Sequence, residues 1–153
     1  MSFFIGEIEA TFDEKGRVVL PADYKSQMGG SVPRGQLAVQ VDKHVKCLNV
    51  YTIDEWERQV SKIRSKLNLN NPDHARMLDS FLRRSRVITV PENCRFTIPA
   101  QFLNAVGIVK QVMFTGQCER MRLWDIKEYQ KYVDSLGDVD KLFDEKFGGE
   151  EAD

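Results

Sequence analysis

Apolar and polar residues alternate along the first part of the chain, and this period is typical of a half-buried β-strand. The apolar positions are, in order, Ile8, Ala10, Phe12, Val18 and Leu20. A charged segment interrupts the alternation, and within it Gly16 can adopt a positive φ while Asp13 can accept hydrogen bonds from turn amides. The pattern predicts two strands joined by a tight turn. Pro21 has no amide hydrogen for a β-ladder, so we expect the second strand to end there and a short helix to follow near residues 22–28.

The strand, turn and proline recur 78 positions later in the chain. Residues 11–22 align with residues 89–100, and the inward positions of the strands are apolar in both copies. A second match, between residues 48–56 and 121–129, has an offset of 73. The second copy is therefore five residues shorter. We expect the deletion in the loop that corresponds to residues 29–35, because loops tolerate changes in length.

Helical periodicity replaces the alternation at the end of each copy. A single apolar stripe predicts a helix that starts at Thr52 and contains Trp56, Val60, Ile63 and Leu67. Asn71 before Pro72 is a good cap and first-turn pair for a connecting helix. The same reasoning predicts helices after Pro99, from Ile126, and through Val139, Leu142, Phe143 and Phe147. The remaining strands are expected at residues 37–41, 47–51, 87–90, 109–115 and 120–124.

Together these elements predict an α+β fold in which two copies of one unit are related by pseudo-twofold symmetry. The first repeat with its C-terminal helix covers residues 1–67, and a helical connector covers residues 68–80. The second repeat covers residues 81–135, and residues 136–153 form an acidic C-terminal helix and tail.

The composition, 42% apolar and 29% charged over 153 residues, is that of an ordinary globular protein. The formal net charge is −1, but the segment 134–153 holds eight acidic residues and two lysines, so it carries −6 and residues 1–133 carry +5. Mild basicity permits a nucleic-acid partner without requiring one. The three cysteines form no CxxC pair, and no segment has the length of a signal-peptide core or a membrane span. We therefore expect a cytoplasmic protein with reduced thiols and no membrane partner.

Sequence motifs of common enzymes are absent: there is no phosphate-binding loop, dinucleotide fingerprint, GxSxG elbow or HExxH pair. We therefore expect no catalytic residues and no cofactor. His44 and Cys47 are two possible metal ligands, but a structural zinc site uses about four, so no metal is expected. Cys94 lies beside Arg95, and a neighbouring cation can lower a thiol pKa, yet a small residue that fills the turn is the simpler interpretation.

Arg17 and Arg95 occupy the same position in the two turns, where the turn meets the following strand. A single basic turn is most simply a solvated hairpin. When two diverged copies agree on an outward arginine, a shared contact becomes the better explanation. A planar guanidinium suits phosphate oxygens and the guanine edge, and a two-stranded ribbon fits the major groove. The residues alone leave a plain hairpin and a nucleic-acid site both open.

A set of segments distributed over residues 3–133 links the chain to a known family. They are Phe4–Glu7, Asp13–Arg17 with Leu20-Pro21, Leu48–Tyr51 with Glu55-Trp56, Arg95 with Ile98-Pro99, Val112–Gly116 and Leu123–Asp125. In this combination the sequence resembles the MraZ family of bacterial transcriptional regulators, which is related to the AbrB-like (SpoVT-AbrB) swapped-hairpin DNA-binding fold. The resemblance implies that each half interlocks its hairpins into a small β-barrel edged by short helices.

The resemblance also implies which residues contact DNA. The DxxxR signature of the family falls on Asp13 and Arg17, with Lys15 as the basic turn residue and Gly16 as a residue that supports the turn. The second copy departs from the pattern, because Pro91 stands where the family usually has aspartate and Cys94 where it usually has glycine. Lys15, Arg17 and Arg95 are therefore the implied DNA contacts.

The implied partners are double-stranded DNA, at promoter repeats of the division and cell-wall gene cluster, and the chain itself, as a ring-shaped homo-oligomer. The implied location is the cytoplasm, in association with the nucleoid. The resulting hypothesis is a sequence-specific DNA-binding transcriptional regulator that acts as a repressor and is not an enzyme. The alternative is an oligomeric protein-interaction or assembly module without specific DNA binding.

Overall fold

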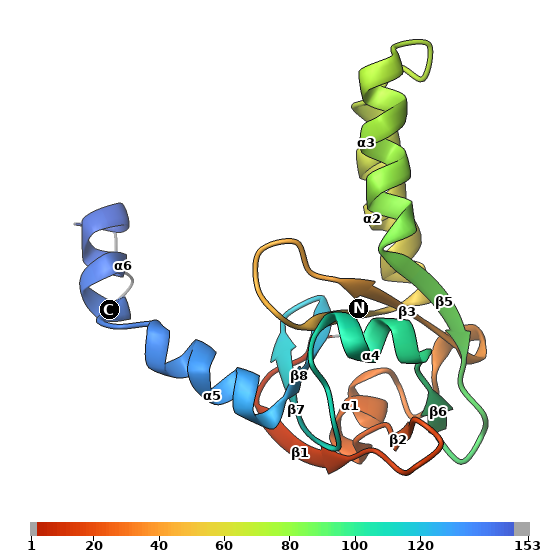
Figure 1. The fold of residues 1–153 in the computed structure, drawn as a ribbon, viewed down its shortest axis with the longest axis vertical. Coiled ribbons are helices and arrows are strands. Elements are labelled where there is room, and N and C mark those ends of the chain that lie inside the picture. Colours follow the sequence, from red (N-terminus) through yellow and green to blue (C-terminus); the bar gives the residue numbers. More distant parts are fainter. Residues whose placement is uncertain (1–2, 149–153) are drawn as a thin grey trace.

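A computed structural model describes residues 3–148, and the end of the predicted acidic tail, residues 149–153, lies outside the described residues. The fold is α+β, as predicted, with an antiparallel sheet in the order β1-β7-β8-β4-β3-β5 and a two-stranded sheet of β2 and β6 (Figure 1). The strands are β1 (Glu7–Thr11), β2 (Arg17–Val19), β3 (Gln36–Val41), β4 (Leu48–Thr52), β5 (Ser85–Thr89), β6 (Arg95–Thr97), β7 (Gln111–Gln117) and β8 (Arg120–Asp125). The helices are α1 (Ala22–Gln27), α2 (Ile53–Ser65), α3 (Pro72–Arg83), α4 (Ala100–Ala105), α5 (Ile126–Ser135) and α6 (Val139–Phe147), with a 3₁₀ turn η1 (Pro33–Gly35).

Strand pairing relates the two copies by a pseudo-twofold axis. In the small sheet the central pair is Val18 with Phe96, which are equivalent positions of the two copies. In the large sheet β4 and β8 pair around Asn49 and Arg122, which are again equivalent. The strand order reads as a symmetric series, because β1 corresponds to β5, β7 to β3 and β8 to β4. Closure of each half into a barrel and the division into domains at the expected boundaries stay predictions.

Each copy gives its first strand to the other copy. Strand β1 pairs with β7 of the second copy, and β5 pairs with β3 of the first. The registers also show where the second copy is shorter. Ile8 of β1 pairs with Phe114 of β7. Arg86, the equivalent of Ile8 in the second copy, pairs with Val39 of β3. Equivalent positions of β3 and β7 are therefore 75 residues apart. Three of the five missing residues therefore precede β7 and two lie between β7 and β8, so the expectation of one deletion site was wrong.

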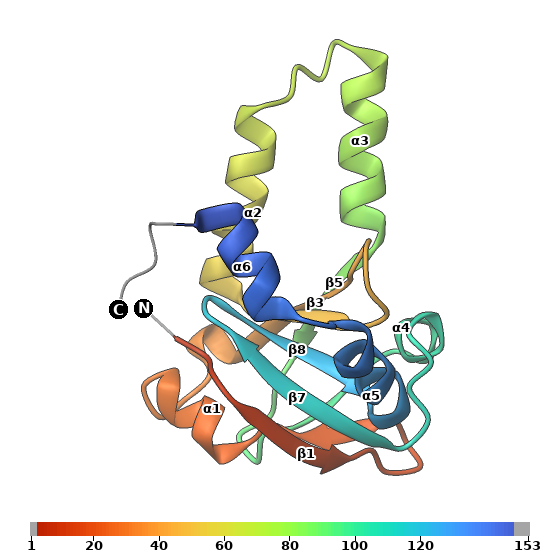
Figure 2. The same ribbon diagram turned by 90° about the vertical axis from the view of Figure 1, so that its left-hand side faces the viewer.

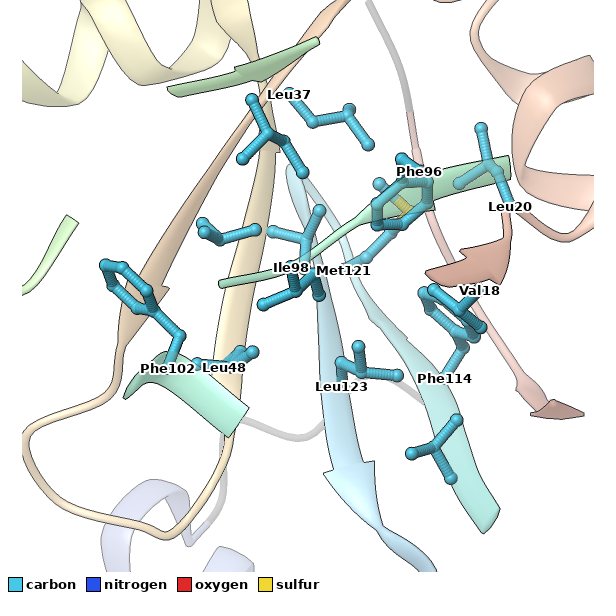
Figure 3. Close-up of a cluster of buried hydrophobic side chains, with 14 of the residues drawn as sticks. Val18, Leu20, Leu37, Leu48, Phe96, Ile98, Phe102, Phe114, Met121 and Leu123 are labelled. Atoms are coloured by element: carbon cyan, nitrogen blue, oxygen red, sulfur yellow. The ribbon is translucent and has the colours of Figure 1, made fainter. Parts of the chain in front are cut away.

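The main core lies between the two sheets and takes side chains from both copies (Figure 3). The strands that follow the turns supply Val18, Leu20, Phe96 and Ile98, each at most 2% exposed. They meet Phe114, Met121 and Leu123 of the large sheet in the same cluster. Burial of each large apolar side chain contributes about 1.5–3 kcal/mol, so the two turns rest on a rigid base.

Two helical extensions project from the sheet (Figures 1 and 2). Helices α2 and α3 form an antiparallel hairpin, capped by the side chains of Thr52 and Asn71 as predicted. At its base Trp56 stacks on Phe81 with ring centroids 5.3 Å apart. Helices α5 and α6 form a separate arm (Figure 1). Among the described residues, no helix combines the length and hydrophobicity required to span a membrane.

Candidate nucleic-acid interface

The first turn is organised by one carboxylate. Oδ1 of Asp13 accepts hydrogen bonds from the amides of Lys15 and Arg17, both at 2.9 Å. Oδ2 accepts a hydrogen bond from Nε of Arg17 at 2.8 Å. Gly16 has φ +75° and donates its amide to the carbonyl of Asp13 at 3.1 Å. Asp13 therefore holds both the backbone of the turn and the Arg17 side chain, and Gly16 supplies the left-handed conformation that the turn requires.

The second turn has the same backbone despite its different residues. Cys94 has φ +60°, close to that of Gly16, and donates its amide to the carbonyl of Pro91 at 2.9 Å. Pro91 offers no side-chain acceptor, but Oδ1 of Asn93 accepts the amide of Arg95 at 3.0 Å. Asn93 thus replaces part of the role of Asp13. Asn93 was not among the predicted site residues, although an asparagine two residues before the arginine is a known local acceptor pattern.

The antiparallel pairing of β2 with β6 fixes the two turns at opposite ends of one short ribbon. The amide of Leu20 donates to the carbonyl of Cys94 at 2.9 Å, and the amide of Ile98 donates to the carbonyl of Gly16 at 3.1 Å. Side chains alternate between the two faces of this ribbon. The inward face is buried in the core, whereas the outward face carries Arg17, Val19, Arg95 and Thr97. Figure 1 shows both turns at the end of the molecule opposite the tip of the α2–α3 hairpin.

The antiparallel pairing brings the two predicted arginines to one carboxylate. Oδ2 of Asp13 lies 2.8 Å from Nε of Arg17 and 3.5 Å from Nη1 of Arg95. The arginine side chains remain 40% and 44% exposed, respectively. The hydrogen bond from the Arg17 amide lowers the pKa of Asp13, burial opposes it, and the Arg17 side chain and the Lys15 amide add to the decrease, so that the pKa is about 2. Asp13 is therefore ionised at neutral pH.

The exposed donors of this surface match acidic or phosphate-bearing partners. Lys15 is exposed at the tip of the first turn, and within residues 3–148 it has no side-chain ion pair. The ion pair of Arg17 uses Nε, and its terminal nitrogens make no hydrogen bond within residues 3–148. Glu14 and Glu92 are also exposed in the turns. The formal charges of residues 13–17 and 91–95 sum to zero. Binding by a single chain must therefore depend on the geometry of the donors more than on net charge.

Two further arginines, a thiol and an imidazole lie outside the two turns. Arg84 donates to the carbonyl of Val41 at 2.7 Å, and Arg86 lies over the Phe102 ring at 6.0 Å, so both have local structural contacts. Cys47 is buried, which raises its pKa to about 12, whereas His44 is exposed.

The sequence matches a family model described as "MraZ protein, putative antitoxin-like" over residues 3–80 and 87–145. The chain belongs to the MraZ family. A relative named transcriptional regulator MraZ from Phocaeicola vulgatus is 32% identical over 145 residues, which cover 95% of this chain and 94% of the relative. Proteins of the same name from Bacteroides fragilis and Photorhabdus laumondii are 31% identical over 128 residues and 30% identical over 134 residues. These matches cover 84% and 87% of this chain, and 80% and 87% of the relatives.

The resemblance to the MraZ family is therefore confirmed, and the matched residues include both turns. The roles of Lys15, Arg17 and Arg95 as DNA contacts, and of Asp13 and Gly16 as turn supports, stay predictions that the resemblance implies.

Proposed function

We propose that this MraZ-family protein is a sequence-specific DNA-binding transcriptional regulator that acts as a repressor. Its DNA contacts are Lys15, Arg17 and Arg95, and it has no catalytic role. The observation that carries the proposal is the outward face of the β2–β6 ribbon, where the arginines of both turns meet beside Asp13. The names of the relatives, transcriptional regulators, support the same conclusion.

The ribbon has the form that the major groove admits. That groove is about 12 Å wide and accepts a two-stranded β-ribbon. Asp13 orients the guanidinium of Arg17 by its Nε, which leaves the two terminal nitrogens to bind phosphate oxygens or O6 and N7 of guanine. Lys15, at the tip of the turn, acts as a point charge on the DNA backbone. The buried side chains beneath the ribbon keep the donors in place before DNA arrives.

A ring-shaped homo-oligomer supplies the affinity that one copy lacks. Because the two turns have no net charge, the binding of a single copy is weak. Several copies that face the same DNA engage repeated short sites, and each further contact is then intramolecular. The targets are promoter repeats of the division and cell-wall gene cluster, and the protein acts in the cytoplasm at the nucleoid.

The test is a titration of promoter DNA with the folded variants Arg17→Ala, Arg95→Ala and the double variant. One lost bidentate contact costs about 1–3 kcal/mol, so each single variant should bind roughly 5- to 150-fold more weakly. Arg64→Ala is the matched control, because Arg64 is an exposed arginine in the last turn of α2, and the tip of the α2–α3 hairpin lies at the opposite end of the molecule from the turns (Figure 1). Unchanged binding by the double variant, or binding that ignores salt concentration, would exclude this surface.

A second candidate function is an assembly module that binds protein and not DNA. Two observations favour it: the second turn lacks the carboxylate of the first, because Pro91 replaces Asp13, and α6 exposes an apolar face. An intact oligomer of the wild-type chain that shows no preference for promoter over random DNA would support this alternative.

A further inference from the structure

Helix α6 is an amphipathic helix that has no partner among the described residues. Every residue from Val133 to Gly148 is exposed. Its apolar side chains lie on one stripe and are 44–52% exposed: Val139, Leu142, Phe143 and Phe147. At about 100° per residue, acidic side chains flank this stripe on both sides, Lys141 lies opposite, and Lys146 of the last turn lies within the stripe. An apolar stripe of this kind is normally covered.

The α2–α3 hairpin contains a groove with the complementary character. The groove has a volume of about 620 Å³. Its apolar lining is Ile63, Leu67, Met77 and Phe81, and Met77 is 59% exposed. Helices α2 and α3 touch at their base through Trp56 and Phe81, so the rest of the hairpin offers two half-covered apolar faces. A third amphipathic helix would cover them.

The charges of the two surfaces are opposite. The groove is lined by Lys43, Lys66, Arg76 and Arg84, with Asp73 as its only acidic residue among those described. Arg76 is paired with Asp73, but Lys43 and Lys66 have no ion pair within residues 3–148. The stripe on α6 is flanked by Asp138, Asp140, Asp144 and Glu145. Docking would place acidic residues at a basic rim, which favours this pairing and its orientation.

We propose that α6 of one copy of the chain docks in the α2–α3 groove of a second copy. Helix α6 is short enough to lie along the hairpin, because its nine residues span about 14 Å, whereas the 13-residue α2 spans about 20 Å. Tyr129 and Tyr132 of α5 pack on Trp124, with ring centroids 5.5 and 4.5 Å away, and so direct the arm away from the body. Figure 1 shows the arm and the hairpin on different sides of the molecule. The inference rests on the self-association part of the proposed function and not on DNA contact.

The decisive experiment is a disulfide between two differently tagged variants of the full chain. Cys118 is exposed and is first replaced by serine, whereas Cys47 and Cys94 are buried and stay. Phe143→Cys in one chain and Met77→Cys in the other should form a dimer that carries both tags, because docking brings these positions together. Lys141→Cys, on the opposite face of α6, is the matched control and should not form this dimer with Met77→Cys. Absence of the two-tag dimer, or equal yield with the control, would overturn the proposal.

Association itself provides a second measurement. The double variant Leu142→Asp/Phe143→Asp should raise the dissociation constant of self-association about tenfold or more, as measured by sedimentation. Both residues lie at the centre of the stripe. Lys43→Glu with Lys66→Glu should weaken it too, and mixing with Asp140→Lys/Asp144→Lys chains should restore it. Unchanged mass in the Leu142/Phe143 variant would overturn the proposal. The Arg17→Ala/Arg95→Ala chain should still crosslink, so a failure of the DNA-binding proposal is distinguishable from a failure of this one.

Discussion

Replacement of Asp42 by alanine is expected to destabilise the fold by about 3–5 kcal/mol, because it leaves a buried guanidinium without its counter-charge. Nη2 of Arg122 lies 3.1 Å from Oδ1 of Asp42, and the two side chains are only 10% and 8% exposed. Oδ1 also accepts Nδ2 of Asn49 at 3.0 Å, and Oδ2 accepts the amides of His44 and Val45, each at 2.9 Å. All hydrogen-bonding capacity of the carboxylate is thus used inside the protein.

A double-mutant cycle separates the ion pair from its surroundings. Arg122→Met alone should also destabilise, because Asp42 then keeps its negative charge with fewer donors. The double variant Asp42→Ala/Arg122→Met should cost less than the sum of the two single changes, with a coupling energy of roughly 0.5–3 kcal/mol. Asp42→Asn, which keeps an acceptor at Oδ1, should be milder than Asp42→Ala.

The same contacts predict the effect of pH on stability. Burial by itself raises the pKa of Asp42, but the hydrogen bonds from Asn49, Val45 and His44 and the charge of Arg122 outweigh it and lower the pKa from 3.8 to about 2. A lowered carboxyl pKa stabilises the folded state above the unfolded pKa. This contribution is therefore complete above about pH 4 and is lost as the pH falls toward 2, and the Asp42→Asn variant should lack it.

Urea unfolding, followed by the fluorescence of Trp56 and Trp124, measures these free energies at one fixed protein concentration, because self-association also stabilises the fold. Asp79→Asn, at an exposed site on α3, is the control for loss of a carboxylate. A change below about 0.5 kcal/mol for Asp42→Ala, which is typical of surface sites, would refute the reasoning.

Two further predictions concern backbone geometry. Gly116→Ala should destabilise by about 2 kcal/mol or more in the same assay, because its Cβ would lie 2.2 Å from the amide nitrogen of Ile5 and push the N-terminal segment off β7. Asn71→Ala should cost about 1 kcal/mol, because the Asn71 side chain caps α3 through the amides of Asp73 and His74, and a normal stability for this variant would exclude that role.

Local features of the fold were predictable because they depend on neighbouring residues. Alternation, proline positions and capping residues placed the strands and helices within a few residues of their observed bounds. The duplicated turn and the inward positions of its strands were also visible in the sequence. The split of the five-residue deletion between two loops was missed, because only strand pairing aligns β7 with β3.

The sequence indicated which residues form the candidate site, but not how their side chains are arranged. The repeat identified Arg17 and Arg95 separately, as residues 78 positions apart. Nothing in the sequence indicated that Arg95 of the second repeat would reach Asp13 of the first repeat, or that Arg122 would be buried against Asp42. Charged residues are expected at the surface unless a partner is known.

The amino-acid sequence of this protein thus specifies two turns, their basic residues and the helices around them, because turn and helix preferences act over a few neighbouring positions. Only the folded structure decides that β2 pairs with β6, that two arginines share one carboxylate, and that no segment within residues 3–148 covers α6 or the α2–α3 groove. These features depend on contacts between residues far apart in the chain, and such contacts are set by packing of the whole core.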